Sequence, residues 1–295
     1  MIDVQNLTKS FDGFWALDGL CLHVPRGSVY GLVGPNGAGK TTLIRHLAGV
    51  LRPTSGSVTI GGLPVYENLA VKRRLAWIPD ELFCQGSDGV RDLMRLYKSV
   101  YPSFDDTRYK QLGEVFALDE KRPIRRFSKG MQKQAALWLA ICCRPDYLLL
   151  DEPVDGLDPV MRRQVWSLLM EDVAGRGMTV LVSSHNLREL EDVCDHVGIM
   201  HKGKMLLERS LDALQENIVK VQLVTEHPLP EGLNILHKQT VGRIQTLIVR
   251  GEQHEVAEKL AQCQPLLCDL LPLSLEEIFI YELGGVDYDI KNIVL

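Results

Sequence analysis

The sequence predicts an α/β fold, in which a mostly parallel sheet is covered by helices. Three observations point to this class. An apolar, strand-like run at Val29–Val33 leads directly into a glycine-rich loop. Strand-like and helical segments alternate between Tyr147 and Met200. Purely helical periodicity occupies the stretch between Asp88 and Leu118, which indicates a helical insertion.

The predicted elements follow in chain order. The N-terminal part is rich in short β segments, and a turn signal at Pro53-Thr54-Ser55-Gly56 precedes one of them. Strands are expected at Ile2–Leu7, Leu20–Val24, Val29–Val33 and Val58–Ile60, with a helix at Thr42–Gly49. The helical insertion is expected over residues 82–140, with apolar residues at helical spacing at Val90, Leu93, Met94, Leu96 and Tyr97, then at Tyr109, Leu112, Val115 and Phe116.

Beyond the insertion the alternation resumes. Strands are expected at Tyr147–Leu150, Thr179–Ser183 and Val197–Met200, and helices at Val160–Ala174 and Leu187–Cys194. After about residue 215 a separate α+β subdomain is predicted, with strands at Ile218–Val224 and Thr246–Val249, a helix at Glu255–Gln262 and a capped helix at Ser274–Phe279.

Composition excludes several classes of function. The chain has 295 residues, 45% of them apolar, and a formal net charge of −5, which argues against general nucleic-acid binding. Seven cysteines without a CxxC pair are typical of buried thiols in a reducing cytoplasm. The longest apolar run, Ala135–Cys143, is far shorter than the ~18 residues of a membrane span. A membrane function would therefore need a second chain that supplies the membrane part.

The glycine-rich loop carries the clearest chemical signal. Its residues are Gly34, Pro35, Asn36, Gly37, Ala38, Gly39, Lys40 and Thr41, with Thr42 opening the next helix. Glycines let the backbone N–H groups surround a polyphosphate, and the helix N-terminus adds positive charge. Lys40 can reach the β- and γ-phosphates, and the Thr41 hydroxyl can ligate Mg²⁺. The sequence therefore predicts that the chain binds ATP or GTP.

A second signal is the acid pair Asp151–Glu152 at the end of an apolar strand. Phosphate-bound Mg²⁺ would offset the cost of placing these charges there. Asp151 is expected to hold the metal and Glu152 to polarise the water that attacks the γ-phosphate. The alternative is an acid pair that only caps the following turn.

Together these motifs resemble the nucleotide-binding subunit of an ATP-binding cassette (ABC) transporter, over about residues 1–212. The same order of motifs includes Phe127-Ser128-Lys129-Gly130-Met131-Gln132, Asp155-Gly156-Leu157-Asp158 and Ser183-Ser184-His185. The resemblance implies a P-loop NTPase cassette with an antiparallel β subdomain and a helical insertion. It also implies ATP and Mg²⁺ as cofactors and a head-to-tail pair of cassettes. The partner cassette is a second copy or a paralogue.

The resemblance assigns further roles. Ser128 and Gly130 would cover the ATP held by the partner copy, although Ser128 could also be a plain helix N-cap. His185 would contact the γ-phosphate and the attacking water, and Asp158 would link the paired subunits. Phe11 would stack on adenine, with Phe14 or Trp15 as alternatives.

Three positions, in two of the motifs, depart from the family pattern. Lys129 and Met131 replace residues of the signature loop, where Lys129 stands at a usual glycine. Asp80 is the best match for a glutamine that contacts Mg²⁺ and the membrane partner; its carboxylate can still ligate the metal. Gln85 could take this role only with a longer loop.

The expected function is thus ATP hydrolysis by a cassette dimer that drives a separate membrane permease, on the inner face of the cell membrane. A separate cassette chain with a C-terminal extension, here residues 213–295, resembles bacterial exporters, and import is the alternative direction. The extension could support the dimer, regulate it or act as a stabilising lid. A soluble ABC protein without a permease and a nucleotide-gated regulatory module are the alternatives of other classes.

Overall fold

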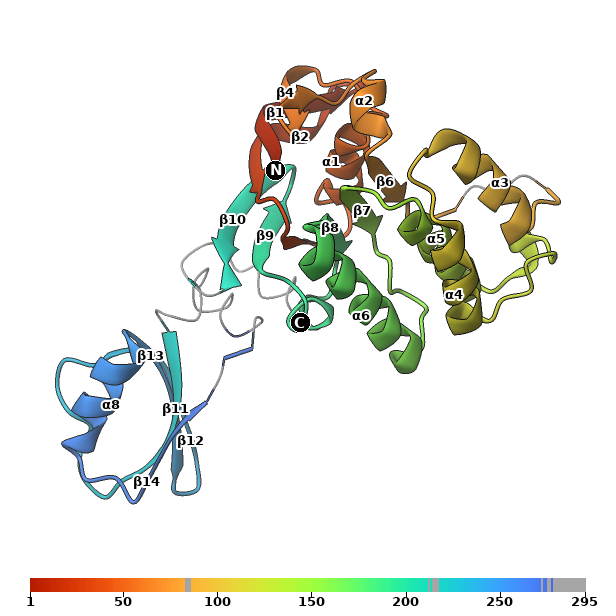
Figure 1. Ribbon diagram of the computed structural model, residues 1–295. Coiled ribbons are helices and arrows are strands. Elements are labelled where there is room, and N and C mark those ends of the chain that lie inside the picture. Colours follow the sequence, from red (N-terminus) through yellow and green to blue (C-terminus); the bar gives the residue numbers. More distant parts are fainter. Residues whose placement is uncertain (83–85, 212, 214–217, 272, 275–276, 278–295) are drawn as a thin grey trace. The chain divides into compact units, whose positions relative to one another are not determined.

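The computed structural model describes residues 1–82, 86–211, 213, 218–271, 273–274 and 277 (Figure 1). The chain forms two compact units. The first unit contains Met1–His185 and Val193–Glu208, and the second contains Asn186–Asp192 and Arg209–Leu295. The domain boundary predicted between residues 212 and 213 stays a prediction.

The first unit is built on a mostly parallel sheet, as predicted. Its strand order among the described residues is β10-β9-β3-β8-β7-β6. The pairs β3–β8, β3–β9, β7–β8 and β6–β7 are parallel. Every residue of β3, β7 and β8 is buried, which is expected for strands covered on both faces. The strands are β3 (Val29–Val33), β6 (Leu75–Ile78), β7 (Tyr147–Asp151), β8 (Thr179–Ser184), β9 (His196–His201) and β10 (Lys204–Ser210).

A second sheet of the first unit has the order β2-β1-β4-β5. Strand β1 pairs antiparallel with both β2 and β4, so the antiparallel subdomain is confirmed. The turn predicted at residues 53–56 is shorter than expected, because β4 already starts at Ser55 and pairs with Thr8 of β1. The strands are β1 (Ile2–Phe11), β2 (Phe14–Val24), β4 (Ser55–Ile60) and β5 (Leu63–Pro64).

The helical insertion lies on one side of the first unit (Figure 1). Trp138 of α5 is fully buried and stacks on two rings of α4, with ring centroids 4.7 Å apart for Tyr109 and 6.3 Å apart for Phe116. The insertion contains α3 (Val90–Val100), α4 (Asp106–Phe116), η1 (Ile124–Arg126) and α5 (Lys129–Cys142). The other helices of the first unit are α1 (Lys40–Leu47), α2 (Leu69–Lys72) and α6 (Pro159–Arg176).

One predicted helix is wrong. Residues 187–194 form only the 3₁₀ turn η2 (Leu187–Glu189), followed by further turns. The N–H of Leu190 donates to the carbonyl of Leu187, three residues back, so the segment closes in tight turns. The apolar spacing of Leu187, Leu190 and Cys194 therefore reflects burial of a turn and not the face of a helix.

The second unit contains a sheet of order β12-β13-β11-β14, in which the pairs β12–β13, β13–β11 and β11–β14 are antiparallel. Helix α8 packs its Val256 and Leu260 against Val221 and Val249 of the sheet, which gives this unit a core of its own. The elements are β11 (Ile218–Val224), β12 (Asn234–Val241), β13 (Ile244–Arg250), α8 (Gln253–Ala261) and β14 (Leu267–Leu271). The helix predicted at Ser274–Phe279 lies largely outside the described residues, although Ser274 and Glu277 exchange capping hydrogen bonds.

The prediction of buried thiols is wrong at two positions. Cys21 and Cys268 are exposed, whereas Cys142, Cys143, Cys194 and Cys263 are buried, and all six are free. Cys84 lies outside the described residues.

Across the described part of the chain, no helix combines the length and the apolar character needed to cross a membrane.

Candidate functional site

Four neighbouring strands deliver the candidate residues to one edge of the parallel sheet. Gly34 follows β3, His185 follows β8, Asp151 ends β7, and Asp80 follows β6. Because these strands run parallel, their carboxyl ends meet at the same edge. A pocket of about 360 Å³ lies there, and the predicted residues that line it are Phe11, Pro35, Asn36, Gly37, Gly39, Lys40, Thr41, Thr42, Asp80 and Glu152.

The phosphate-binding loop (residues 34–41) needs its glycines for contacts within the chain. A Cβ on Gly34 would lie 2.4 Å from the carbonyl oxygen of Met200. Gly39 has a φ of +107°, and its Cβ would lie 2.8 Å from the carbonyl oxygen of Ala16. Neither Gly34 nor the buried Ala38 lines the pocket, so these two residues shape the loop from behind.

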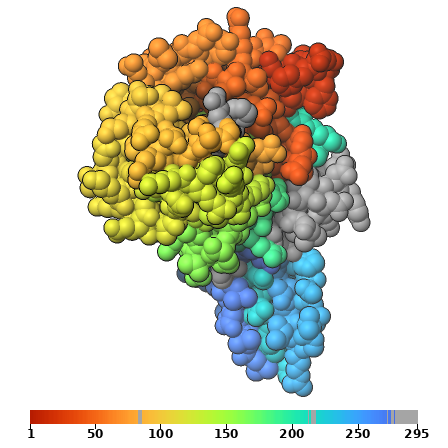
Figure 2. All heavy atoms as spheres, turned by 90° about the vertical axis from the view of Figure 1, so that its right-hand side faces the viewer, coloured from red at the N-terminus to blue at the C-terminus, as the bar shows by residue number. Residues whose placement is uncertain are grey.

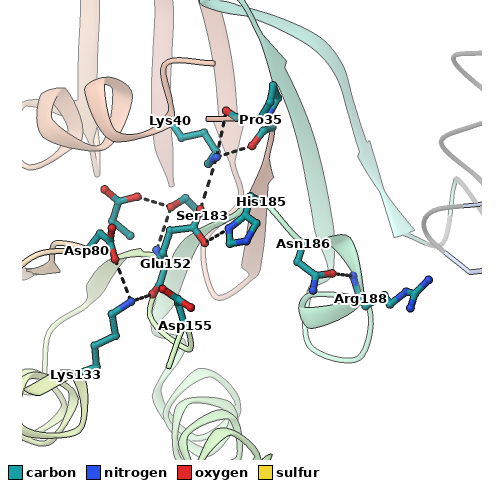
Figure 3. A network of polar contacts seen from close by, with 12 residues as sticks. Pro35, Lys40, Asp80, Lys133, Glu152, Asp155, Ser183, His185, Asn186 and Arg188 are labelled. Carbon is teal, nitrogen blue, oxygen red and sulfur yellow. Dashed lines mark hydrogen bonds and ion pairs between the residues drawn. The ribbon is translucent and has the colours of Figure 1, made fainter. Parts of the chain in front are cut away.

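Lys40 is the first residue of α1, and its side chain is only 6% exposed. Its Nζ donates to the carbonyl of Gly34 at 2.5 Å and lies 3.6 Å from Oε1 of Glu152 (Figure 3). Burial lowers the pKa of this ammonium, while the charges of Glu152 and Asp151 oppose that shift. Lys40 thus contacts a backbone carbonyl and a carboxylate at the pocket, and the oxygens of a bound phosphate would take over these contacts.

Asp151 is 1% exposed and has one oxygen without a partner. Its Oδ1 accepts a hydrogen bond of 2.5 Å from the hydroxyl of Ser183 on the adjacent strand. Its Oδ2 is buried without a hydrogen-bond partner among the described residues. A buried, unsatisfied carboxylate oxygen is costly unless a ligand satisfies it. This oxygen fits a hard divalent cation such as Mg²⁺.

Glu152 connects three parts of the site. Its Oε2 lies 3.0 Å from Nδ1 of His185, and its Oε1 faces Lys40 (Figure 3). Its N–H donates to both the carbonyl and the hydroxyl of Ser183, each at 3.2 Å. Ser183 therefore positions both acids, a role that the sequence did not reveal. His185 is half-exposed and lies outside the pocket lining.

Asp80 lines the pocket but is already paired with lysines. Its Oδ1 lies 3.1 Å from Nζ of Lys133 and 3.7 Å from Nζ of Lys129. Lys133 is 2% exposed and also donates to the backbone carbonyl of Glu152. Sequence reasoning missed Lys133, although a lysine only two residues before the apolar run at Ala135–Cys143 was a signal for it. The alternative Gln85 lies outside the described residues.

Two aromatic side chains border the pocket. Phe11 and Phe14 both line it, and both are exposed, whereas Trp15 does not line it. Nζ of Lys9 lies 5.1 Å from the ring centroid of Phe11. Phe11 and Phe14 therefore stay alternatives for a stacking partner of a base.

The remaining predicted residues lie outside the pocket lining. Ser128 caps α5 by accepting a hydrogen bond from the N–H of Met131, so its N-cap role is present in this chain. A Cβ on Gly130 would lie 2.4 Å from the carbonyl oxygen of Gly156. Asp158 caps α6, accepting from Val160 N and Met161 N at 3.0 Å each.

A separate hollow of about 530 Å³ lies between α2, β6 and the end of α3. Leu69, Trp77 and Val100 supply apolar surface, and Lys72 and Arg73 supply positive charge. Leu69 is 71% exposed, which is unusual for a large apolar side chain. Figure 2 shows the orange residues of the α2 region beside the yellow residues of the insertion on one face.

Comparison with known proteins gives consistent matches. The family described as "ABC transporter" matches residues 17–155. The chain is 30% identical over 288 residues to the ABC transporter ATP-binding protein YtrB of Bacillus subtilis (strain 168), covering 97% of this chain and 99% of that protein. It is 34% identical to the bacitracin transport ATP-binding protein BcrA of Bacillus licheniformis, covering 73% of this chain and 72% of that protein.

Solved structures show the same fold. A structure titled "Structure of ATP binding subunit of ABC transporter" has 27% identity and a TM-score of 0.67, covering 73% of this chain and 92% of that chain. A dimeric ATP-binding cassette with bound ADP and Pi has 19% identity and a TM-score of 0.64, covering 72% of this chain and 99% of that chain.

Proposed function

Because this chain belongs to the ABC transporter family of ATP-binding proteins, we propose that it couples Mg²⁺-dependent ATP hydrolysis to export through a separate permease. The chain binds and hydrolyses ATP, as the ATPases of this family do. The observation that carries the proposal is the position of Glu152, which lies in the phosphate pocket between Lys40 and His185.

Different residues of the chain bind the phosphates, hold the metal and accept the proton. Lys40 and the N–H groups of the phosphate-binding loop bind the β- and γ-phosphates. Asp151 Oδ2 and the Thr41 hydroxyl would hold Mg²⁺, which neutralises charge on the phosphates when bound. Glu152 accepts a proton from the attacking water, and His185 holds the Glu152 carboxylate in place.

We further propose that two copies, or this chain and a paralogue, pair head to tail. Ser128, Gly130 and Asp158 lie outside the pocket of their own chain, which supports a role toward a partner's nucleotide. The start of α5 also presents a helix N-terminus to an anion. The proposed extension, residues 213–295, would support this pair.

The hollow beside α2 supports a docking role for the permease. Its apolar lining residues together with Lys72 and Arg73 fit a short amphipathic helix with an acidic end. The chain would then act on the inner face of the cell membrane. Export is the proposed direction because relatives are named as bacitracin and lantibiotic transport proteins.

The first test is phosphate release by the purified chain. ATP with Mg²⁺ should give steady release, and chelation of Mg²⁺ should abolish it. ATPase activity that is unchanged after chelation of Mg²⁺ would contradict the proposal that Asp151 and Thr41 hold this ion.

The second test separates transport from a soluble role. A membrane protein encoded beside this chain is co-expressed with it, and the complex is purified in detergent. L69E should lose the complex while keeping basal ATPase activity, whereas V241E, a comparably exposed apolar position in the second unit, should keep both. Loss of the complex with V241E but not with L69E would contradict docking at α2.

A further inference from the structure

Four charged residues form a cluster between the pocket and the start of α5. The charge cluster consists of Asp80, Lys129, Lys133 and Asp155, and its formal charges cancel. Lys129 bridges the two carboxylates, with Nζ 2.8 Å from Asp155 Oδ2 and 3.7 Å from Asp80 Oδ1. Lys133 lies 3.1 Å from the same Asp80 oxygen. One oxygen of Asp80 therefore faces two ammonium groups.

Lys133 extends this cluster to the catalytic acid. Its Nζ donates to the backbone carbonyl of Glu152, and Figure 3 shows it reaching both Glu152 and Asp80. The side chain is 2% exposed, so its charge depends on these partners for compensation. Asp80 is the carboxylate that faces it, while Glu152 contributes only a neutral carbonyl.

We propose that Asp80 is a positioning residue and not a ligand of Mg²⁺. Its carboxylate fixes Lys133, and Lys133 fixes the backbone of Glu152 relative to α5. The inference rests on the proposed Mg²⁺-dependent hydrolysis, and it revises the metal role expected for Asp80 from the sequence.

The charges explain why a carboxylate is needed at this position. An amide would remove the carboxylate that pairs with the buried ammonium of Lys133, and removing one partner is the costly way to break an ion pair. Two ammonium groups within 4 Å of the same Asp80 oxygen would also repel a divalent cation from it. Asp151 Oδ2, by contrast, has no hydrogen-bond partner among the described residues.

The test compares D80N, K133M and the double variant with D146N. Asp146 is a matched control because it is also a half-exposed aspartate paired with a cation, Arg74, but it precedes β7 at the opposite end from Glu152. In the absence of nucleotide and with EDTA, D80N and K133M should each lower the melting temperature by roughly 5 °C. D146N should lower it by less than about 2 °C.

The double variant should be no less stable than either single variant, because both substitutions remove one interaction. If the stability losses of D80N and K133M add up in the double variant, the proposed pairing of Asp80 with Lys133 is overturned. If K133M does not accumulate as folded protein, D80N decides. D80N at wild-type stability would then overturn the proposal, and a loss clearly larger than that of D146N would support it.

The second readout is the Mg²⁺ dependence of ATP hydrolysis. D80N should lower kcat by about 10–100-fold, because Glu152 is misplaced, with KM for ATP changed by less than about twofold. The Mg²⁺ concentration at half-maximal activity should stay within about twofold of wild type. If D80N alone raises the Mg²⁺ concentration needed for half-maximal activity tenfold or more, the proposal is overturned and Asp80 is assigned as a ligand of the metal. Wild-type protein without Mg²⁺-stimulated hydrolysis would refute the proposed function, while the stability arm would still decide the Asp80–Lys133 pairing.

Discussion

The backbone of Glu152 has a φ of +50°, a value that non-glycine residues seldom adopt. Two hydrogen bonds from its N–H to Ser183 hold it there, together with the Lys133 contact to its carbonyl. Strained backbone that neighbouring groups hold in place is common at functional sites. The conformation directs the carboxylate toward Lys40 and His185.

E152Q should lower kcat by about 10²–10⁴-fold, because an amide cannot accept the proton of the attacking water. ATP affinity should be kept or increased, since Lys40 no longer faces a competing carboxylate. Phosphate release and calorimetry measure the two effects. E171Q, the same substitution at an exposed position of α6, should behave as wild type. Wild-type turnover by E152Q would exclude Glu152 as the base.

The ion pair between Lys129 and Asp155 makes stability depend on pH. The hydrogen bond from Lys129 lowers the pKa of Asp155 below its ordinary value of 3.8, and the same pair raises the pKa of Lys129. The stabilisation from Asp155 is therefore present above pH 3.8 and is lost as the pH falls through its folded pKa. Lys129 loses its contribution only at alkaline pH, above its ordinary value of 10.5.

D155N should consequently be less stable than wild type at neutral pH, and the difference should shrink toward acid pH. Urea unfolding midpoints measured between pH 3 and 7 check this. The effect is small because both side chains are about half-exposed. A difference that grows as the pH falls would contradict the pairing.

At single positions the sequence indicated candidate residues but not the contacts between them. It indicated Lys40, Asp151, Glu152 and His185 because strand ends and glycine-rich loops carry local patterns. It could not indicate that Ser183 serves both acids, or that Lys133 reaches Asp80, because these contacts join different strands and helices. Such contacts depend on the register of β7 against β8 and on the packing of α5.

At the scale of elements, the start of α5 lies against the loop that precedes α6. The Cβ that G130A adds would lie 2.4 Å from the carbonyl oxygen of Gly156, a backbone atom that cannot rotate away. G130A should therefore lower the melting temperature by several degrees, about 5 °C, and reduce turnover.

G175A is the matched control, since Gly175 lies in α6 with open space around its Cβ position. Alanine favours helix over glycine, so G175A should raise the melting temperature by about 1–3 °C. Thermal unfolding of the two variants side by side measures the difference. Equal shifts of the same sign would contradict the close approach at Gly130.

Element prediction succeeded where the pattern was strong. The all-buried strands β3 and β7 and the periodic helices α3 and α4 were expected from apolar spacing. Strands β5, β6, β10, β12 and β14 were missed. Most residues of β12 and β14 are exposed and show no clear alternation, and β5 and β6 are only two and four residues long. The helix expected at residues 187–194 failed because spacing alone does not separate a helix from buried turns.

At the scale of the whole molecule, ATP should convert the chain into a dimer. E152Q with ATP should elute at twice the monomer mass of 33.1 kDa, and with ADP as the monomer. S128E, built on E152Q, places a negative charge at the start of α5 and should prevent this shift. S167E, at an exposed position of α6, is the control and should still dimerise. A monomeric E152Q at saturating ATP would refute the head-to-tail pair.

The chain leaves the first unit directly after His185, returns at Val193 and leaves again after Glu208. Cutting the gene at codon 208 would therefore not yield the first unit alone. Such a fragment would keep Asn186–Asp192 while losing the rest of the unit to which those residues belong. A minimal cassette for crystallography needs a redesigned connection in place of residues 186–192, directly after His185, the proposed partner of Glu152.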